Sequence, residues 1–219
     1  MAVVGLVNGR RYNSFTAKTP HSRGKIQEAK ELARNVEIKA RLASYQTQFD
    51  LAKTLCGSGG EPIHQVDFFF NCDRGRLKLR LFDDDHGELI FYRRGDQTGP
   101  KLSDYVLART DQPTSLREAL GRAYGEYATI EKERTLFLCG RTRIHLDRVR
   151  DLGDFLELEV VLEDGEDVSA GEREAAELME KLAVGKETLI ECAYVDLMQC
   201  RSAVPAENPR WEQSSDNHG

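Results

Sequence analysis

The feature that most constrains the fold of this chain is a repeated strand-like alternation that sets charged residues on one face. The first example is NVEIKARL, residues 35–42, in which Asn, Glu, Lys and Arg alternate with Val, Ile, Ala and Leu. Successive side chains of a β-strand point to opposite faces, so this segment has one charged and one apolar face. RGRLKLRLF (74–82) and GELIFYRR (87–94) alternate in the same way on either side of the turn DDDHG, which predicts a β-hairpin.

Further segments complete a predicted antiparallel sheet. Strands are expected at residues 65–70, 103–110, 128–139, 141–149 and 154–162. Helical spacing of apolar residues predicts helices within 43–57 and at 114–127, 170–184 and 188–200. About seven or eight strands with a few helices indicate one α+β domain, whose sheet could close into a barrel.

The charged faces of the predicted strands are sorted by sign. Acids are prominent on the first and last strands, and bases dominate the middle ones. A half-exposed sheet with a solvated polar face explains any single strand. Lys, Arg and Glu on strand after strand are better explained by a barrel whose charged face points inward and whose apolar outer face is covered by helices. Unpaired charges in a low-dielectric interior are unfavourable, so this cavity must be wet and is expected to hold an anion and metal ions.

Two kinds of side chain in such a cavity indicate its ligand. Several Lys and Arg side chains around one site match a multiply charged phosphate ester. Glu157 and Glu159 lie two positions apart on one strand, so they point the same way at a spacing of about 7 Å. With Glu37 completing the set, they can hold an oxygen-preferring cation such as Mg²⁺. The pattern predicts a site for a metal ion and a triphosphate.

Composition limits the alternatives. The chain has 219 residues and 40% hydrophobic content, which is enough for one sizeable core. A net charge of −6 disfavours duplex nucleic acid as a partner. No apolar run approaches the roughly 20 residues of a membrane span. The five cysteines form no CxxC pair, and no secretory signal is seen, so we expect reduced thiols in the cytoplasm.

The two ends of the chain differ from its middle. Residues 1–27 contain five basic residues, several Ser and Thr, and no Asp or Glu. This composition fits either a disordered extension or an organelle transit peptide, and the second alternative would make the protein mitochondrial. We expect a disordered basic extension over 1–32, one domain over 33–200 and a disordered polar tail over 201–219.

Taken in order, these segments resemble the CYTH superfamily of triphosphate tunnel metalloenzymes. NVEIK resembles the ExExK signature, and RGRLKLR, GELIFYRR, the basic pair of EKER, RTRIHLD and FLELE follow in the order of the family. The resemblance spans about residues 33 to 198 and is greatest to class IV adenylyl cyclase-like and thiamine triphosphatase-like proteins. It implies a closed eight-stranded antiparallel β-barrel, flanked by helices, that acts on triphosphates with Mg²⁺ or Mn²⁺.

The resemblance also implies roles for individual residues. The implied metal ligands are Glu37, Glu157 and Glu159, and the implied catalytic residues are Glu37 and Lys39. The implied substrate-binding residues are Lys39, Arg41, Lys78, Arg80, Arg94, Lys132, Arg134 and Arg143. Glu88 is a further expected lumen position, whereas a structural role is favoured for His145 and is the simplest for Asp147.

One position departs from the family signature. Asn35 stands where the signature has its first Glu. Asn can accept a hydrogen bond but carries no charge and is a poorer metal ligand. The substitution puts a second metal ion in question, together with any reaction that needs this carboxylate to orient or deprotonate water. The other acidic and basic positions are intact, which indicates that binding survives.

Three functions fit such a site. Metal-dependent hydrolysis of inorganic triphosphate, ATP or thiamine triphosphate is the leading hypothesis, because hydrolysis needs no base-recognition pocket. The alternatives are conversion of ATP to cyclic AMP and pyrophosphate, and a non-catalytic triphosphate-binding module, which Asn35 favours. The expected partner is a small-molecule triphosphate rather than duplex nucleic acid or a membrane, and the chain is expected to be a monomer or a homodimer.

Overall fold

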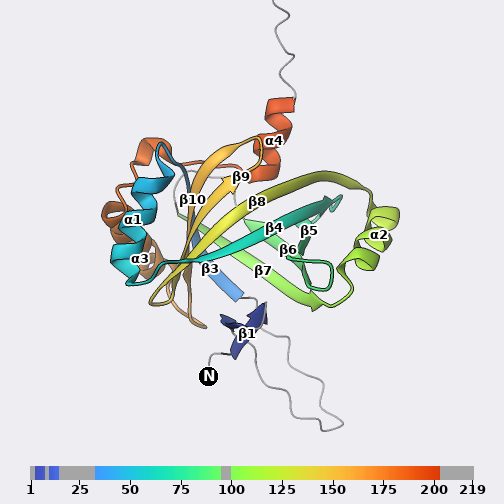
Figure 1. The fold of residues 1–219 in the computed structure, drawn as a ribbon, viewed down its shortest axis with the longest axis horizontal. Helices are drawn as coiled ribbons and strands as arrows, with labels where there is room; N and C mark the ends of the chain where they lie inside the picture. Colours follow the sequence, from blue (N-terminus) through green and yellow to red (C-terminus); the bar gives the residue numbers. More distant parts are fainter. Residues whose placement is uncertain (1–2, 8–9, 15–32, 95–99, 203–219) are drawn as a thin grey trace, which may run out of the picture.

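Eight strands of the computed structural model form a closed antiparallel barrel (Figure 1). The structure describes residues 3–7, 10–14, 33–94 and 100–202. The strand order around the barrel is β10-β3-β7-β6-β5-β4-β8-β9, and pairing of β9 with β10 closes the circle. The strands are β3 (Ala33–Arg41), β4 (Glu61–Phe70), β5 (Arg76–Leu81), β6 (Gly87–Arg94), β7 (Lys101–Thr110), β8 (Glu126–Cys139), β9 (Thr142–Val149) and β10 (Gly153–Val161). The predicted barrel is therefore confirmed, with small differences at the strand ends.

The first barrel strand, β3, joins the two ends of the domain. It pairs with β10 on one side and with β7 on the other. In the ladder with β10, Glu37 lies opposite Glu159 and Lys39 lies opposite Glu157. Residues that face each other across a ladder share one face of the sheet. Barrel closure therefore places the charged residues of the first and last strands side by side on one wall of the lumen.

Two helices cover the apolar outer face of the strands around β3, as the alternation predicts. α1 (Tyr45–Cys56) lies against β8 and β9, and α3 (Val168–Lys181) lies against β3 and β10 (Figure 1). Beneath them, β3 contributes Val36, Ile38 and Ala40, which are completely buried. This layer is the largest hydrophobic cluster of the described residues.

A third helix covers the other side of the barrel. α2 (Pro113–Tyr124) packs against β4 and β5, at the right of Figure 1. Its Leu116 and Leu120 contact a cluster that includes Phe68 and Phe70 of β4. The apolar face of the hairpin region is thus turned outward and covered, which leaves the charged face for the lumen.

An apolar cluster fills the end of the lumen next to α4 (Tyr194–Ser202). Its buried members are Phe69, Ile130, Val149, Leu152, Phe155, Ala193, Tyr194 and Val195. Phe155 shares a face of β10 with Glu157, and its ring lies 4.9 Å from the ring of Tyr194, centroid to centroid. The lumen is therefore charged in one part and closed by apolar packing at the α4 end, a division that the alternation alone does not predict.

The predicted helix at 188–200 is wrong in its first half. A short 3-10 turn, η1 (Lys186–Thr188), precedes an extended segment, and α4 begins only at Tyr194. Leu189 forms a β-bridge with Ala40, and the amide of Ile190 donates to the carbonyl of Lys39 at 2.9 Å. This backbone pairing with β3 satisfies groups that a helix would otherwise bond internally, so the segment stays extended.

The N-terminal region adds a small sheet. β1 (Val3–Val7) and β2 (Arg10–Ser14) pair antiparallel within the segment expected to be a disordered extension. Residues 15–32 and the expected tail from 203 onward lie outside the described residues. The five cysteines are free thiols, as expected. Among the helices described here, none combines the length and the apolar character of a membrane span.

We predict that Phe155→Ala lowers the free energy of unfolding by about 3–5 kcal/mol, the usual loss for a large aromatic residue in a packed core. Phe155 is completely buried and links β10 to α4 through Tyr194. Urea denaturation followed by circular dichroism measures the change. Phe155→Leu is the matched control, because it retains much of the buried volume and should lose less. Equal losses in the two variants would contradict the role given to the aromatic ring.

Candidate functional site

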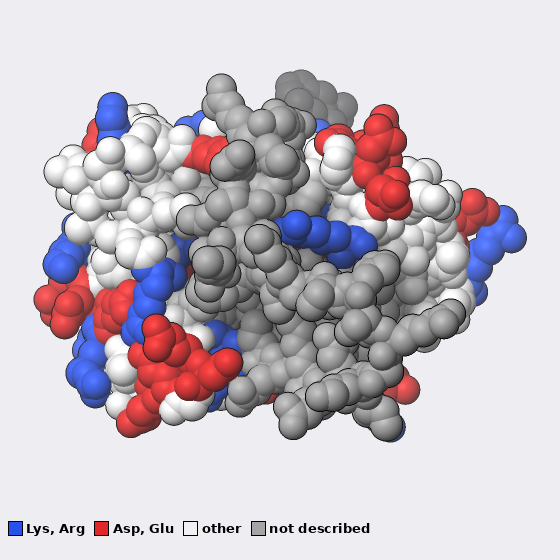
Figure 2. All heavy atoms as spheres, turned by 90° about the horizontal axis from the view of Figure 1, so that it is seen from below, with Lys and Arg blue, Asp and Glu red and all other residues white. Residues whose placement is uncertain are grey.

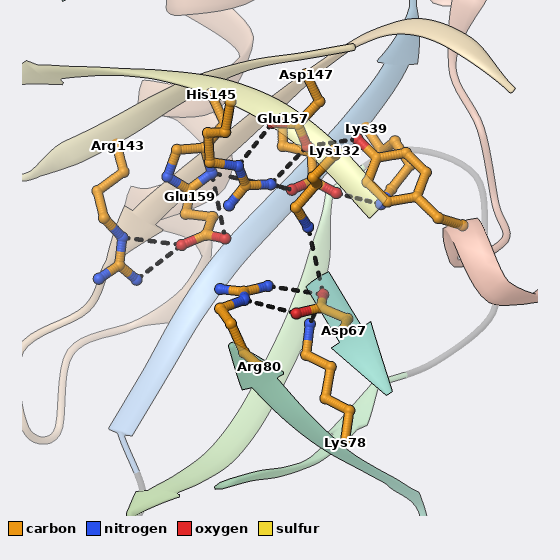
Figure 3. Close-up of polar contacts among 12 residues, drawn as sticks. Lys39, Asp67, Lys78, Arg80, Lys132, Arg143, His145, Asp147, Glu157 and Glu159 are labelled. Atoms are coloured by element: carbon orange, nitrogen blue, oxygen red, sulfur yellow. Dashed lines mark hydrogen bonds and ion pairs between the residues drawn. The ribbon is translucent and has the colours of Figure 1, made fainter. Parts of the chain in front are cut away.

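One buried carboxylate in the lumen, that of Asp67 on β4, is surrounded by three cations (Figure 3). Its Oδ1 accepts a hydrogen bond from Arg80 Nε at 2.7 Å, and its Oδ2 accepts one from Lys78 Nζ at 2.8 Å. Lys132 Nζ lies 3.4 Å from the same Oδ2. β4 lies between β5 and β8 in the barrel. Inward residues of three neighbouring strands therefore meet at this point.

Three cations around one carboxylate leave a local excess of positive charge. Burial alone would raise the pKa of Asp67, but the charges of Arg80, Lys132 and Lys78 hold that pKa well below its usual value. Burial lowers the pKa of Lys132 to about 7; Asp67 opposes this change, and Arg134 and Arg80 reinforce it by repulsion. Burial and the charge of Arg80 also lower the pKa of Lys78. An anion bound here would relieve this repulsion.

A second group of charges, on β3, β8, β9 and β10, pairs acids with bases. Arg134 donates to both carboxylate oxygens of Asp147 at 2.6 Å, and its Nη2 also donates to Glu157 Oε2 at 2.5 Å. The hydroxyl of Tyr194 donates to Asp147 Oδ2 at 2.9 Å. Lys39 Nζ pairs with Glu157 Oε1. All five side chains are buried, so each charge depends on its partner inside the barrel.

Glu159, two residues farther along β10, has one carboxylate oxygen turned away from its cation. Oε2 accepts a hydrogen bond from Arg143 Nε at 2.8 Å, whereas Oε1 lies 3.6 Å from His145 Nδ1 (Figure 3). Burial would raise the pKa of Glu159, but the nearby charges, that of Arg143 first, lower it to about 2. This carboxylate is therefore ionised at neutral pH.

His145 points a ring nitrogen at these carboxylates. The residue is 5% exposed, and its Nδ1 has no hydrogen-bond partner among the described residues. Burial, followed by the charge of Arg134, lowers the pKa of His145, which favours the uncharged ring. His145, Glu157 and Glu159 each offer one ligand atom, and these atoms lie within 4.8 Å of one another. Such a group can hold a divalent cation.

The structure brings together most of the residues predicted for the site. Those whose side chains meet in ion pairs of the lumen are Lys39, Lys78, Arg80, Lys132, Arg134, Arg143, Glu157 and Glu159. Glu37 is half-buried, and the residue opposite it on β10 is Glu159. Glu88 lies opposite Arg80 on the β5–β6 ladder. The expected acidic and basic positions thus occupy one lumen.

Two predicted binding residues are not brought into this group. Arg41 lies at the α4 end, where its Nη1 donates to the carbonyl of Leu152 at 2.8 Å and its guanidinium lies 4.7 Å from the centroid of the Phe155 ring. These contacts direct it away from the cluster of cations around Asp67. The side chain of Arg94 falls outside the described residues, although the residue ends β6.

Sequence reasoning misses Asp67 and Tyr194. Asp67 belongs to QVDFFF, in which the run of aromatic residues conceals that Gln65 and Asp67 share the lumen face of β4. The alternation of the neighbouring strands, extended to this one, could have found it. No sequence signal indicates that Tyr194 closes the lumen, because that contact depends on where α4 begins.

Three polar atoms of the lumen are buried without a hydrogen-bond partner among the residues that the structure describes. They are Asn35 Oδ1, Gln65 Oε1 and His145 Nδ1. Asn35 occupies the position of the first Glu of the signature and is 5% exposed. A buried polar atom without a partner is destabilising, and such atoms in native proteins often face a ligand or water. Their presence indicates that the lumen receives polar groups.

The described residues on one face of the molecule carry charges of both signs. On the face seen in Figure 2, the Lys and Arg side chains of the described residues are interspersed with Asp and Glu. Exposed ion pairs such as Arg122 with Glu118, at 2.7 Å, contribute little to stability. On this face, charge of one sign is therefore less concentrated than around Asp67 in the lumen.

We predict that Asp67→Asn lowers the free energy of unfolding by about 3–5 kcal/mol, because it leaves the buried Lys132 and the partly buried Lys78 and Arg80 without a counter-charge. The matched control is Asp154→Asn, which removes a surface pair with Arg148 at 4.0 Å and should change stability by about 1 kcal/mol or less. Urea denaturation at neutral pH compares the two. Similar small losses in both variants would show that Asp67 is not the counter-ion of this cluster.

Comparison with known proteins agrees with this geometry. The CYTH domain family model matches residues 33–194, which include all eight barrel strands. A conserved hypothetical protein from Pyrococcus furiosus has a similar structure, with a TM-score of 0.66 and 20% sequence identity over 74% of this chain and 99% of the other. A candidate adenylate cyclase from Vibrio parahaemolyticus aligns with a TM-score of 0.62 and 16% identity over 78% of this chain and 99% of the other.

No curated protein matches the sequence of this chain. The structural similarities, at this level of identity, concern the fold alone. The family model, in contrast, matches the sequence over most of its length and includes the strands that carry the lumen charges. This chain therefore belongs to the CYTH domain family.

Proposed function

We propose that this protein hydrolyses a triphosphate that binds in the barrel lumen together with a divalent cation. The observation that supports this most directly is the cluster of Lys78, Arg80 and Lys132 around the single carboxylate of Asp67. Arg134, next to this cluster on β8, adds a further buried cation. A triphosphate carries several negative charges along a short chain, so it matches this arrangement better than a single carboxylate does.

Each cation has a distinct part in binding the phosphates. The planar guanidinium of Arg80 can donate two parallel hydrogen bonds to one phosphate, as it now does to Asp67 at 2.7 and 3.0 Å. Lys78 and Lys132 act as compact positive charges on either side of it. Bound phosphate would take over part of the role that Asp67 has in the free protein.

Glu157 and Glu159 are the proposed ligands of the cation, with Glu37 on the adjacent strand. The geometry fits this role, because Glu159 turns Oε1 away from Arg143 and Glu37 lies opposite Glu159 in the ladder. Carboxylate oxygens are the ligands that Mg²⁺ and Mn²⁺ prefer. When bound, the cation offsets negative charge on the phosphate oxygens during transfer.

Lys39 and Glu37 are the proposed catalytic residues. The Lys39 ammonium is held between Glu157 and the ring of Tyr194, whose centroid is 3.7 Å from Nζ. This places a fixed positive charge beside the carboxylates, where it can stabilise charge that develops on the transferred phosphoryl group. Glu37 is the glutamate of the family signature that this chain retains on β3. We assign it the role of orienting the attacking water.

Hydrolysis is favoured over cyclisation because it needs no site that orients a nucleoside. Cyclisation of ATP requires a site that orients the nucleobase and ribose, so that the 3′-hydroxyl reaches the α-phosphorus. In the described lumen, the apolar region is filled by packed side chains, among them Phe69, Ile130, Phe155 and Tyr194. Hydrolysis requires only water next to the terminal phosphoryl group.

The test of this proposal is a product assay with purified protein, Mg²⁺ or Mn²⁺, and inorganic triphosphate, ATP or thiamine triphosphate. Phosphate, pyrophosphate and cyclic AMP are measured in the same samples. Release of phosphate without cyclic AMP supports the proposal. Cyclic AMP with equimolar pyrophosphate would identify a cyclase, and tight triphosphate binding without product would identify a binding module.

We predict that Glu159→Gln reduces the rate of hydrolysis by about a hundredfold or more, because it removes a charged group that acts on the transition state. The substitution preserves size, and the Arg143 side chain left without its counter-charge is 32% exposed, so the barrel should remain folded. Glu133→Gln, on the outer face of β8 where the side chain is 67% exposed, is the matched control. Full activity of Glu159→Gln would show that the site is assigned wrongly.

We predict that the affinity for inorganic triphosphate falls as the pH rises above about 7, the pKa of Lys132 in the free protein. Above this pH, Lys132 must take up a proton when the anion binds, so the affinity should fall by up to about tenfold per pH unit. Isothermal titration calorimetry in buffers of different ionisation enthalpy measures both affinity and proton uptake. Lys132→Gln should bind more weakly and lose this proton uptake, which separates Lys132 from ionisation of the triphosphate itself. Equal proton uptake by both proteins would contradict the assignment.

A further inference from the structure

We propose that His145 is itself a ligand of the lumen cation, and that its imidazole makes the site prefer Mn²⁺ to Mg²⁺. The proposal rests on the proposed function only in placing a cation at Glu157 and Glu159. It adds a nitrogen to a site that sequence alone composes of carboxylates, and it gives a function to a histidine for which a structural role is otherwise favoured.

The position of the His145 ring carries the proposal. Its Nδ1 lies 3.6 Å from Glu159 Oε1 and 3.9 Å from Glu157 Oε2 (Figure 3). Both separations are too long for a hydrogen bond. They are close to the roughly 3–4 Å that separate two neighbouring ligands of one divalent ion. The three groups are therefore spaced as ligands around a common point rather than as partners of one another.

This nitrogen lacks a partner within the protein itself. His145 is 5% exposed, and its Nδ1 has no hydrogen-bond partner among the residues that the structure describes. A histidine that only supports the fold usually uses its buried nitrogens in hydrogen bonds. A cation between the three groups would satisfy the nitrogen and both carboxylates at once.

The surrounding cations hold the two carboxylates in place for this purpose. Arg143 binds the oxygen of Glu159 that faces away from His145. Arg134 and Lys39 contact the two oxygens of Glu157, and Oε2 keeps a second lone pair for a cation. Such outer contacts orient the ligands of a metal site. An inner set of His145 and two glutamates thus lies within an outer set of three bases.

The imidazole determines which ion this set prefers. Mg²⁺ takes oxygen ligands and keeps several waters, so it gains little from a nitrogen. Transition ions accept imidazole, and Mn²⁺ combines this with a preference for carboxylates. A site with one imidazole and two carboxylates therefore favours Mn²⁺ over Mg²⁺.

The test is the electron spin-echo spectrum of Mn²⁺ added to the purified wild-type protein. Coupling to a ¹⁴N nucleus of the imidazole type is expected and needs neither substrate nor a variant. In titration calorimetry, His145→Gln should lower Mn²⁺ affinity by at least about tenfold, with a smaller change for Mg²⁺. His64→Gln is the matched control, because His64 lies on the outer face of β4 and contacts Glu131 at 3.3 Å. It should retain both the ¹⁴N coupling and the affinity.

The outcomes separate this proposal from the proposed function. Absence of ¹⁴N coupling in the wild-type protein would overturn the role of His145, even if Mg²⁺ supported hydrolysis. Coupling that persists in His145→Gln would overturn it as well. Coupling that is lost in His145→Gln, in a protein that hydrolyses no triphosphate, would support the metal ligand and reject the proposed function.

Discussion

The ion pairs of Arg134 with Asp147 and Glu157 are the interactions on which the interior of the barrel depends. Both carboxylates are buried, and Arg134 on β8 bonds Asp147 of the adjacent β9 and Glu157 of the next strand, β10, at 2.5–2.6 Å. Glu157 in turn pairs with Lys39 on β3, so ion pairs connect the four consecutive strands β8, β9, β10 and β3. A buried charge that loses its partner is strongly destabilising. The strands can therefore close only in a register that matches each cation with an acid.

In the proposed function, the charge pairing inside the lumen makes triphosphate binding an exchange of partners. In the free protein Asp67 already occupies the position among Lys78, Arg80 and Lys132 that an anion would take. An anion with a single charge offers these cations little more than the carboxylate does. A chain of phosphates contacts several cations at once and brings more charge than Asp67, so the exchange becomes favourable. The internal carboxylate thus supports discrimination between a triphosphate and smaller anions.

The alternation of the strands was sufficient to predict the antiparallel sheet and the inward face of most of its strands, because a period of two admits only two faces and one is apolar. The closed eight-stranded barrel was implied by the resemblance to the CYTH superfamily. The alternation could not predict how side chains pack at the strand ends. Arg41 continues the charged face of β3, but packing against Phe155 and a bond to Leu152 fix it at the apolar end. Asp67 was missed because it stands next to a run of aromatic residues, which conceals the alternation. The start of α4 depends on pairing with β3, a contact distant in sequence that no local pattern encodes.

The exposed fraction of the lumen side chains increases from the α4 end of the barrel toward the other end. On β9, the exposed fraction of the side chain rises from 0% at Asp147 to 6% at His145 and 32% at Arg143. On β10 it rises from 9% at Glu157 to 19% at Glu159. The apolar cluster closes the opposite end, at α4. In the proposed function, a triphosphate would therefore enter with its terminal phosphoryl group first, and any organic group would remain near the open end. Because the charged residues would then contact only the phosphates, this arrangement would select for the phosphate chain more strongly than for the group attached to it.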